Sequence, residues 1–258
     1  MDPLNISIIG AGRVATAMAL ELENTGHTIN EIYSRNLKNA RKLVKSLYKA
    51  EVASDLNFSE SHSNIFIIAV SDDAIEEVAS QIELPATAIL AHTSGSRPLS
   101  ILGYAPTENI GVFYPLQTFS EGKKSDFSRI PILIEAENSF TEKQLYKLGR
   151  CLSNRVKAID ARDRLALHVA AVFACNFSNH MFTIASQILK AHKMEFNYLE
   201  PLIMETIEKS LDMGPEKGQT GPAIRKDLET LDIHHEFLKD EKIADIYRII
   251  SQHILDKY

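Results

Sequence analysis

The pattern of hydrophobic and polar positions changes near residue 160. Before it, short β-branched or apolar runs alternate with segments of helical periodicity, which is typical of a parallel sheet covered by helices. Two of the runs, NISII and NIFIIAV, are almost continuously apolar, as expected of strands covered on both faces. The predicted strands are 5–9, 28–34, 51–53, 64–70, 88–92, 110–114, 130–134 and 156–159, and the predicted helices between them are 12–24, 36–48, 73–82, 97–103 and 141–153.

After residue 160 the strand signals stop. Apolar residues then recur at helical spacing in four segments, 162–192, 197–213, 221–231 and 240–257. With right-handed crossovers, the chain is predicted to be an α/β protein: an N-terminal doubly wound, Rossmann-type parallel sheet in residues 1–159 and an all-α C-terminal domain in residues 160–258. The first C-terminal helix is apolar nearly all round, so we expect its own domain, a partner subunit or both to bury it. A homodimer built on the C-terminal helices is the expected assembly.

Composition narrows the class of protein. The 258 residues are 45% hydrophobic and 24% charged, which excludes a disordered or fibrous chain. The net charge of −6 argues against a nucleic-acid partner. No run approaches the roughly 18 to 20 uncharged apolar residues of a membrane span, and no signal peptide is recognisable, so we expect a soluble cytoplasmic protein. Cys151 and Cys175 have no disulfide or zinc spacing and are expected in the core, and His234 and His235 have no third ligand nearby, so no metal is predicted.

A glycine-rich segment, GAGRVA, follows the first strand directly and opens the first helix. In the dinucleotide-binding fingerprint the first glycine makes a tight turn, the second lets the backbone approach a pyrophosphate, and the small third residue lets the helix pack on the strand. The N–H groups of the helix N-terminus then bind phosphate. The residues expected to hold the cofactor here are Gly10, Ala11, Gly12, Arg13 and Val14; the alternative is a glycine turn that serves packing only.

The end of the second strand indicates which dinucleotide binds. NAD-dependent proteins carry an acidic residue there for the ribose 2′-hydroxyl. This chain has Ser34 and Arg35 instead, and a guanidinium can bind a 2′-phosphate through two hydrogen bonds. NADP is therefore favoured over NAD. Glu31 is expected at the surface, and Lys38 either adds charge for the phosphate or is merely solvated.

Six ordered motifs together resemble one known group of proteins. They are GAGRVA at 10–15, AVSDDAI at 69–75, HTSGS at 92–96, FYPLQTF at 113–119, HVAAVFACN at 168–176 and GQTGPAIRKD at 218–227. The chain resembles, over its whole length, Rossmann-like proteins whose C-terminal half is the domain of unknown function 2520. That group is related to pyrroline-5-carboxylate reductases, deazaflavin-dependent NADP reductases and the 6-phosphogluconate dehydrogenase superfamily. The resemblance implies NADP binding and a helical dimerisation domain, but no substrate.

Three of these motifs stand at strand ends, where ligands bind in open α/β sheets. Val70, Ser71, Asp72 and Thr93 are expected beside the nicotinamide ribose and ring, although Asp72 and Asp73 could instead cap a helix. The related hydroxyacid dehydrogenases carry a substrate-binding pair at the place of Ser94 and Gly95. Ser94 could bind a substrate carboxylate or hydroxyl, or the TSGS segment could be only a turn and cap. Tyr114 and Gln117 are expected over the same crevice.

The long helix supplies the acid/base candidate. In the related dehydrogenases a catalytic Lys on this helix precedes an Asn by four residues. Asn176 matches that Asn, but Val172 stands where the Lys would be, which puts ordinary hydroxyacid oxidation in doubt. His168 could protonate a carbonyl or imine product, and in an α-helix it lies about 80° around and roughly 12 Å along from Asn176. The alternative is a histidine that only packs at an interface.

The segment 218–227 is expected to begin the helix 221–231, with Pro222 in its first turn. Such a helix start also presents N–H groups to an anion, and Arg225 would sit one turn inside it. The resemblance favours closure of this loop over the site, so Thr220 and Arg225 are substrate-binding candidates. Arg225 could equally pair with Asp227. The loop 118–129 is the one connection long enough to suggest a lid.

Two functions fit these observations. The first is an NADP-dependent oxidoreductase that transfers hydride between nicotinamide and a small carbonyl, imine or hydroxyacid substrate, with His168 as acid/base and Ser94, Asn176 and Arg225 orienting the substrate. The second is a non-catalytic NADP-binding sensor or metabolite-binding protein, which the missing Lys keeps open. A deazaflavin as second cofactor is a third option, for which the sequence shows no dedicated pocket.

Overall fold

The structure is a computed structural model that describes residues 3–122 and 124–258. It comprises two compact units, Met1–Val172 and Phe173–Tyr258. This division falls inside the long helix, whereas the sequence suggests a boundary at 159/160. The reason is that the first turns of the helix carry Arg164 and His168, whose side chains bond to the strand unit.

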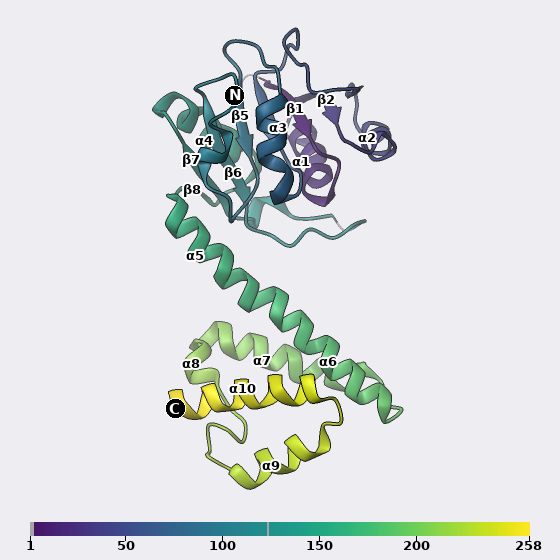
Figure 1. Ribbon diagram of the computed structural model, residues 1–258, viewed down its shortest axis with the longest axis vertical. Coiled ribbons are helices and arrows are strands. Elements are labelled where there is room, and N and C mark those ends of the chain that lie inside the picture. Colours follow the sequence, from purple (N-terminus) through teal and green to yellow (C-terminus); the bar gives the residue numbers. More distant parts are fainter. Residues whose placement is uncertain (1–2, 123) are drawn as a thin grey trace. The chain divides into compact units, whose positions relative to one another are not determined.

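The first unit is built on one eight-stranded sheet (Figure 1). Its strands are β1 (Asn5–Ile9), β2 (Thr28–Tyr33), β3 (Glu51–Ala53), β4 (Ile65–Ile68), β5 (Ile89–His92), β6 (Ile110–Pro115), β7 (Ile132–Ala136) and β8 (Val156–Ala158). The spatial order is β3-β2-β1-β4-β5-β6-β7-β8, and its first six strands have the order of dinucleotide-binding folds. All neighbouring pairs are parallel except β6 and β7. The predicted Rossmann-type sheet is confirmed, with one antiparallel pairing that the periodicity does not reveal.

Helices cover both faces of this sheet, and each face has its own core. On one face, buried side chains of α1 (Arg13–Asn24), α2 (Leu37–Val44) and α4 (Ser139–Leu152) pack against alternate strand residues. On the other face, α3 (Ile75–Gln81) and the 3₁₀ turn η2 (Leu99–Leu102) pack against the remaining strand residues. Because both faces are covered, β4 is buried at all four positions. The carboxyl ends of the central strands remain at the edge of both layers.

The long helix runs through three segments after β8. They are α5 (Ala161–Ala171), a π-helical turn (Val172–Phe177) and α6 (Ser178–Ala191). Its most apolar 18-residue window has a mean hydropathy of 1.2 and is 0% buried within the chain, so by length and composition this helix could cross a membrane. The expectation that no segment meets this criterion is therefore wrong. One such helix is weak evidence for a span, because a helix that packs against another protein chain has the same composition.

The second unit is helical, as predicted. Its later elements are α7 (Glu200–Met213), α8 (Pro215–Gly218), α9 (Leu228–Phe237) and α10 (Glu241–Lys257). The expected helix 221–231 is wrong: residues 221–226 form turns, and α9 begins only at Leu228. Asp227 determines this start, because its carboxylate accepts a hydrogen bond from the Thr230 amide and thereby caps the helix.

Candidate active site

The glycine loop begins with a residue that only glycine can occupy without strain. Gly10 joins β1 to α1 with φ +134°, and its amide donates to the Tyr33 carbonyl at 2.7 Å. A Cβ at this position would lie far inside the van der Waals distance of the Ala69 carbonyl oxygen. The first glycine therefore lets the turn pass directly against the end of β4.

The second glycine has the opposite surroundings. Gly12 has φ −82° and serves as N-cap of α1 without a side-chain hydrogen bond to that helix end, and no atom lies within 4 Å of where its Cβ would be. The first turn of α1 carries no acidic residue, so its N–H groups face an open and electropositive surface. Arg13 is exposed and Ala11 and Val14 are half-buried beside it. This open cradle fits the pyrophosphate of a dinucleotide.

The residues after β2 lie where a 2′-phosphate would be read. Ser34 is half-buried and its hydroxyl accepts from the Asn36 amide at 3.3 Å, while Arg35 and Lys38 are exposed. The prediction that Glu31 is a surface residue is wrong. Its carboxylate accepts hydrogen bonds from the hydroxyls of Ser7, Ser61 and Ser63, because β2 pairs Glu31 with Ser7 inside the sheet. The Glu31 carboxylate is thus already hydrogen-bonded to three serine hydroxyls of its own chain.

The loops after β4 and β5 are bonded to each other. The Asp72 carboxylate accepts from the Ser96 hydroxyl at 2.6 Å, and Arg97 Nε donates to the Asp72 carbonyl at 3.1 Å. A hydrogen bond from the Ser71 side chain lowers the pKa of Asp73. A hydrogen bond from the Asp73 backbone and the positive charges of Arg35 and Arg97 lower this pKa further. The alternative of helix capping by Asp72 or Asp73 is wrong, because the N-cap of α3 is Ala74 and no side chain is hydrogen-bonded to that helix start.

The remaining cofactor candidates frame this pair of loops. Val70 is half-buried against the core of the α3 face, and Ser71 is exposed just beyond β4. Thr93 donates its hydroxyl to the Ile68 carbonyl at 3.3 Å, which joins the ends of β5 and β4. The structure therefore brings the predicted strand-end residues of both loops together at one edge of the sheet.

Ser94 is buried, and its hydroxyl is used within its own loop. The oxygen accepts from the amides of Ser96 at 3.2 Å and Arg97 at 3.1 Å. These are the bonds of the turn-and-cap interpretation. Ser94 thus shapes the loop whose backbone carries Gly95.

A tyrosine and a histidine meet above Gly95. Tyr114, near the end of β6, lies with its Oη 3.0 Å from His168 Nδ1 on α5. A Cβ on Gly95 would come within 2.6 Å of both the Tyr114 ring and His168 Nδ1. Burial, reinforced by the charge of Asp72, raises the pKa of Tyr114, while Arg164 opposes the shift. The phenol is therefore protonated at neutral pH, and the pair can hold or transfer a proton.

Sequence reasoning missed three groups near this pair: the buried Arg164 and His92 and the half-buried Glu135. Arg164 is 1% exposed and forms an ion pair with Glu135 on β7, with Nη2 to Oε2 at 2.7 Å. Its spacing of four residues from His168, on one helix face, is the signal that could have revealed it. His92 is buried at the end of β5 and accepts from the Ser94 amide through Nδ1.

The buried His92 predicts a pH-dependent stability. Burial, together with the positive charge of Arg164, lowers the pKa of His92 to about 4 from its ordinary value of 6.5. The unfolded chain takes up this proton below pH 6.5 and the folded chain only near pH 4, so stability falls as pH decreases through that window, by about 3 kcal/mol in total. In His92→Asn the amide oxygen can still accept from Ser94. Urea unfolding between pH 4 and 8 should show a shallower decline for His92→Asn than for the wild type; equal slopes would contradict this assignment.

The other candidates have different surroundings. Gln117 is exposed, and its side-chain oxygen accepts from the Thr118 amide. Asn176 is exposed within the π-helical turn of the second unit, so the α-helical angle expected between it and His168 does not apply. Thr220 lies on an apolar cavity of the second unit, and Arg225 is exposed in the turns before α9 rather than one turn inside a helix.

The loop 118–129 is held at both ends, and its residue 123 lies outside the described part of the chain. Phe119 and Phe127 are buried and stack on each other, with ring centroids 5.7 Å apart. Between them, Glu121 forms an exposed ion pair with Lys42 of α2 at 2.8 Å. The loop thus packs against the strand unit through its two aromatic ends.

The cysteines do not behave as expected. Cys151 is half-buried on α4, while Cys175 is exposed in the π-helical turn. The prediction of a core position is wrong for Cys175, because the apolar helix around it is bare in the single chain.

Comparison with known proteins gives the family. The protein-family model described as NADP oxidoreductase coenzyme F420-dependent matches residues 5–93. The family model of the domain of unknown function 2520 matches residues 130–254. A solved structure of a provisionally named NADP oxidoreductase from Bacteroides fragilis is 35% identical, with 98% of each chain covered and a TM-score of 0.88. The class is thus a Rossmann-like NADP oxidoreductase. The chain belongs to the family of these oxidoreductases that carry the domain 2520, and the prediction of NADP as cofactor is confirmed at that level.

More distant structures share the fold. A protein from Thermotoga maritima is 20% identical with a TM-score of 0.71, and 98% of each chain is covered. A reductive aminase from Aspergillus terreus, solved with NADPH and ethyl levulinate, is 16% identical with a TM-score of 0.73, covering 98% of this chain and 94% of the aminase. No functionally curated protein matches the chain.

Proposed function

We propose that this protein is an NADPH-dependent reductase that acts on a small carbonyl or imine, or the corresponding dehydrogenase of a small hydroxyacid. The observation that carries the proposal is the hydrogen-bonded Tyr114–His168 pair, which lies at the same sheet edge as the open glycine cradle. A fold shared with a reductive aminase favours a carbonyl or imine over the hydroxyacid. The Val172 in place of the dehydrogenase Lys points the same way.

Each residue has a stated role in this proposal. Gly10 to Val14 hold the pyrophosphate, Ser34 and Arg35 the 2′-phosphate, and Ser71, Asp72 and Thr93 line the nicotinamide side. The bound cofactor supplies a hydride to the substrate carbon. His168 and Tyr114 supply the proton that the carbonyl oxygen or imine nitrogen takes up, so one hydride and one proton are consumed per turnover.

Arg35→Ala should weaken NADPH binding by about 10- to 100-fold, because a charge-assisted pair with the 2′-phosphate is lost. NADH, which lacks that phosphate, should bind Arg35→Ala and wild type alike. The chain has no Trp, so NADPH fluorescence reports binding without interference from that residue. Arg41→Ala is the matched control, because Arg41 is likewise an exposed arginine but lies inside α2. Equal losses in the two variants would remove Arg35 from the site.

A substrate test follows once NADPH binds. Both wild type and His168→Ala would be tested in two directions. Reduction would be tested with NADPH and one of three substrates: ethyl levulinate plus an amine, a ketoacid, or an imine. Oxidation would be tested with NADP and hydroxyacids. Oxidation of NADPH by wild type, abolished in His168→Ala with unchanged cofactor affinity, supports the reductase. Binding without turnover of any of these compounds would favour the alternative of an NADP-binding sensor.

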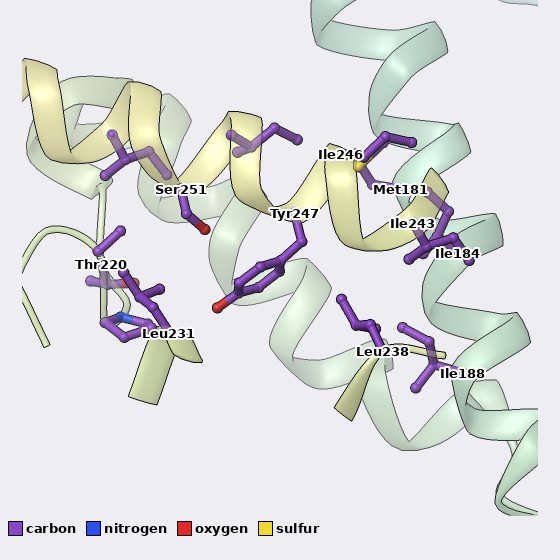
Figure 2. A pocket seen from close by; sticks show the side chains of 14 residues that line it. Met181, Ile184, Ile188, Thr220, Leu231, Leu238, Ile243, Ile246, Tyr247 and Ser251 are labelled. Carbon is purple, nitrogen blue, oxygen red and sulfur yellow. The ribbon is translucent and has the colours of Figure 1, made fainter. Parts of the chain in front are cut away.

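We also propose a homodimer formed through the second unit. All residues of that unit are described, and only Ala223, Leu231 and Ala244 are buried apolar side chains, so it has almost no core of its own. An apolar cavity of about 290 Å³ opens among α6, α9 and α10, where side chains such as Ile184 and Ile246 line it (Figure 2). Surface of this kind is covered in soluble proteins by another chain.

The occupant that fits this surface is a second copy of the chain. Charged residues alternate with the apolar ones along α7, including Glu205, Glu208 and Lys209, which suits a protein interface with a polar rim. In this proposal a second copy also covers the exposed apolar window of the helix Ala161–Ala191, and the protein is a soluble cytoplasmic dimer.

A further inference from the structure

A buried cation lies directly beneath the Tyr114–His168 pair. Arg164 is the largest fully buried side chain of the described chain. Its Nη1 donates to three backbone carbonyls, those of Ser94 at 3.1 Å, Gly95 at 3.3 Å and Arg97 at 2.8 Å. Its Nη2 pairs with Glu135. A charge this deep is tolerated only because these acceptors surround it.

These bonds join the parts that form the candidate site. Arg164 lies on α5, the three carbonyls belong to the loop after β5, and Glu135 belongs to β7. One helical turn further along α5 is His168, whose partner Tyr114 comes from β6. Gly95 supplies the floor, since even a Cβ there would touch both rings. The loop, the histidine and the tyrosine therefore have mutually dependent positions.

Stability alone does not account for such an arrangement. A buried ion pair costs several kcal/mol of desolvation per ion, and replacing both partners with apolar residues is often neutral or stabilising. Three carbonyls directed at one amino group instead fix the backbone of a short loop in a single conformation. The loop in question is the one that carries Ser94 and Gly95.

We propose that Arg164, held by Glu135, is a positioning residue: it locks the Ser94–Arg97 loop to α5 and so keeps His168 paired with Tyr114 over Gly95. The consequence for turnover rests on the proposed function, whereas the pairing of the two rings does not. Removing Arg164 should free His168 while leaving the glycine cradle intact. Lys at this position keeps the charge near Glu135 but cannot reach all the carbonyls with one planar group.

The test compares Arg164→Met/Glu135→Leu, Arg164→Lys and the control Arg162→Met, which changes an exposed cation of the same helix turn. Histidine ¹⁵N spectra of the cofactor-free protein report the His168 tautomer, with its signals assigned by their loss in His168→Gln. We expect one fixed tautomer in wild type and Arg162→Met, an exchanging mixture in the double variant, and an intermediate state in Arg164→Lys. In the folded variants, the equilibrium constant for unfolding, measured with urea, should stay within about threefold of the wild-type value. The dissociation constant for NADPH should stay within the same range.

With a substrate in hand, kcat of the double variant should fall about 100-fold, with a smaller change in KM, because proton transfer and not binding is disturbed. A double variant that keeps the wild-type His168 spectrum overturns the proposal. If the double variant does not fold, the graded spectrum of Arg164→Lys decides, and a wild-type spectrum there overturns it equally. A wild type that binds no NADPH would refute the proposed function, while the histidine spectra would still judge the role of Arg164.

Discussion

Gly10→Ala should lose stability and Gly12→Ala should lose NADPH affinity, although the two glycines are two residues apart in one motif. Gly10→Ala should lower the free energy of unfolding by about 3 kcal/mol or more, which corresponds to roughly 10 °C in melting temperature. Gly12→Ala should melt close to wild type and yet lose NADPH affinity by about 10- to 100-fold.

The reason for the first effect lies in the fold. Gly10 has φ +134°, a conformation that L side chains rarely adopt, and an added methyl would collide with the backbone of Ala69. Neither β1 nor β4 can give way, because both strands are buried in the centre of the sheet. The loss of NADPH binding in this variant is a secondary consequence of the displaced turn.

The second effect lies in the space in front of the helix. Gly12 has an extended backbone that alanine adopts freely, and no protein atom meets the new methyl. The methyl would instead occupy the surface that a pyrophosphate must approach to reach the N–H groups of α1. Thermal melting with and without NADPH separates the cases, since a ligand at 100 times its dissociation constant adds about 2.7 kcal/mol. A Gly12→Ala protein that still gains this stabilisation would show that the loop has a packing role only.

The order of strands and helices is well predicted by periodicity, and strand direction is not. Every predicted strand has a counterpart within a few residues, because buried strands in this sheet leave apolar runs that differ from helical patterns. The antiparallel pairing of β7 with β6 leaves no such trace, since an apolar strand reads the same in either direction. The failed helix at 221–231 shows a related limit: the capping carboxylate of Asp227 overrides the apparent start at Pro222.

The residues of the candidate site also differ in how far the sequence predicts them. Motifs at strand ends are local, so Asp72, Ser94 and Tyr114 could be placed together from the sequence and the topology of the sheet. The burial of Arg164 could not be predicted, because it depends on acceptors contributed by segments distant in the sequence. His92 accepts from the Ser94 amide only two residues away, and its burial follows from the position of β5 inside the sheet. The contact between Tyr114 and His168 also joins residues 54 positions apart. Hydrophobic periodicity does not predict a contact between residues this far apart in the sequence.

Ile207→Asp/Leu211→Asp should convert a dimer into a monomer. Both residues lie on α7, four positions apart and thus on one helix face, and they are 43% and 80% exposed in the single chain. A carboxylate buried in an apolar interface loses its hydration without gaining a partner, so we expect the dimer dissociation constant to rise about 100-fold or more. Light scattering during gel filtration should give twice the 28.8 kDa chain mass for wild type and a mass near one chain for the variant.

Tyr48→Asp provides the matched control. Tyr48 is 86% exposed, more than either α7 residue, but it lies in the first unit after α2. The same carboxylate introduced there should leave the dimer intact, because an isolated exposed apolar side chain needs no partner. A wild-type protein that is monomeric at micromolar concentration, or that sediments with lipid vesicles instead, would contradict the homodimer. In the latter case the helix Ala161–Ala191 would have a membrane as its partner, and the α7 substitutions would be expected to change vesicle binding.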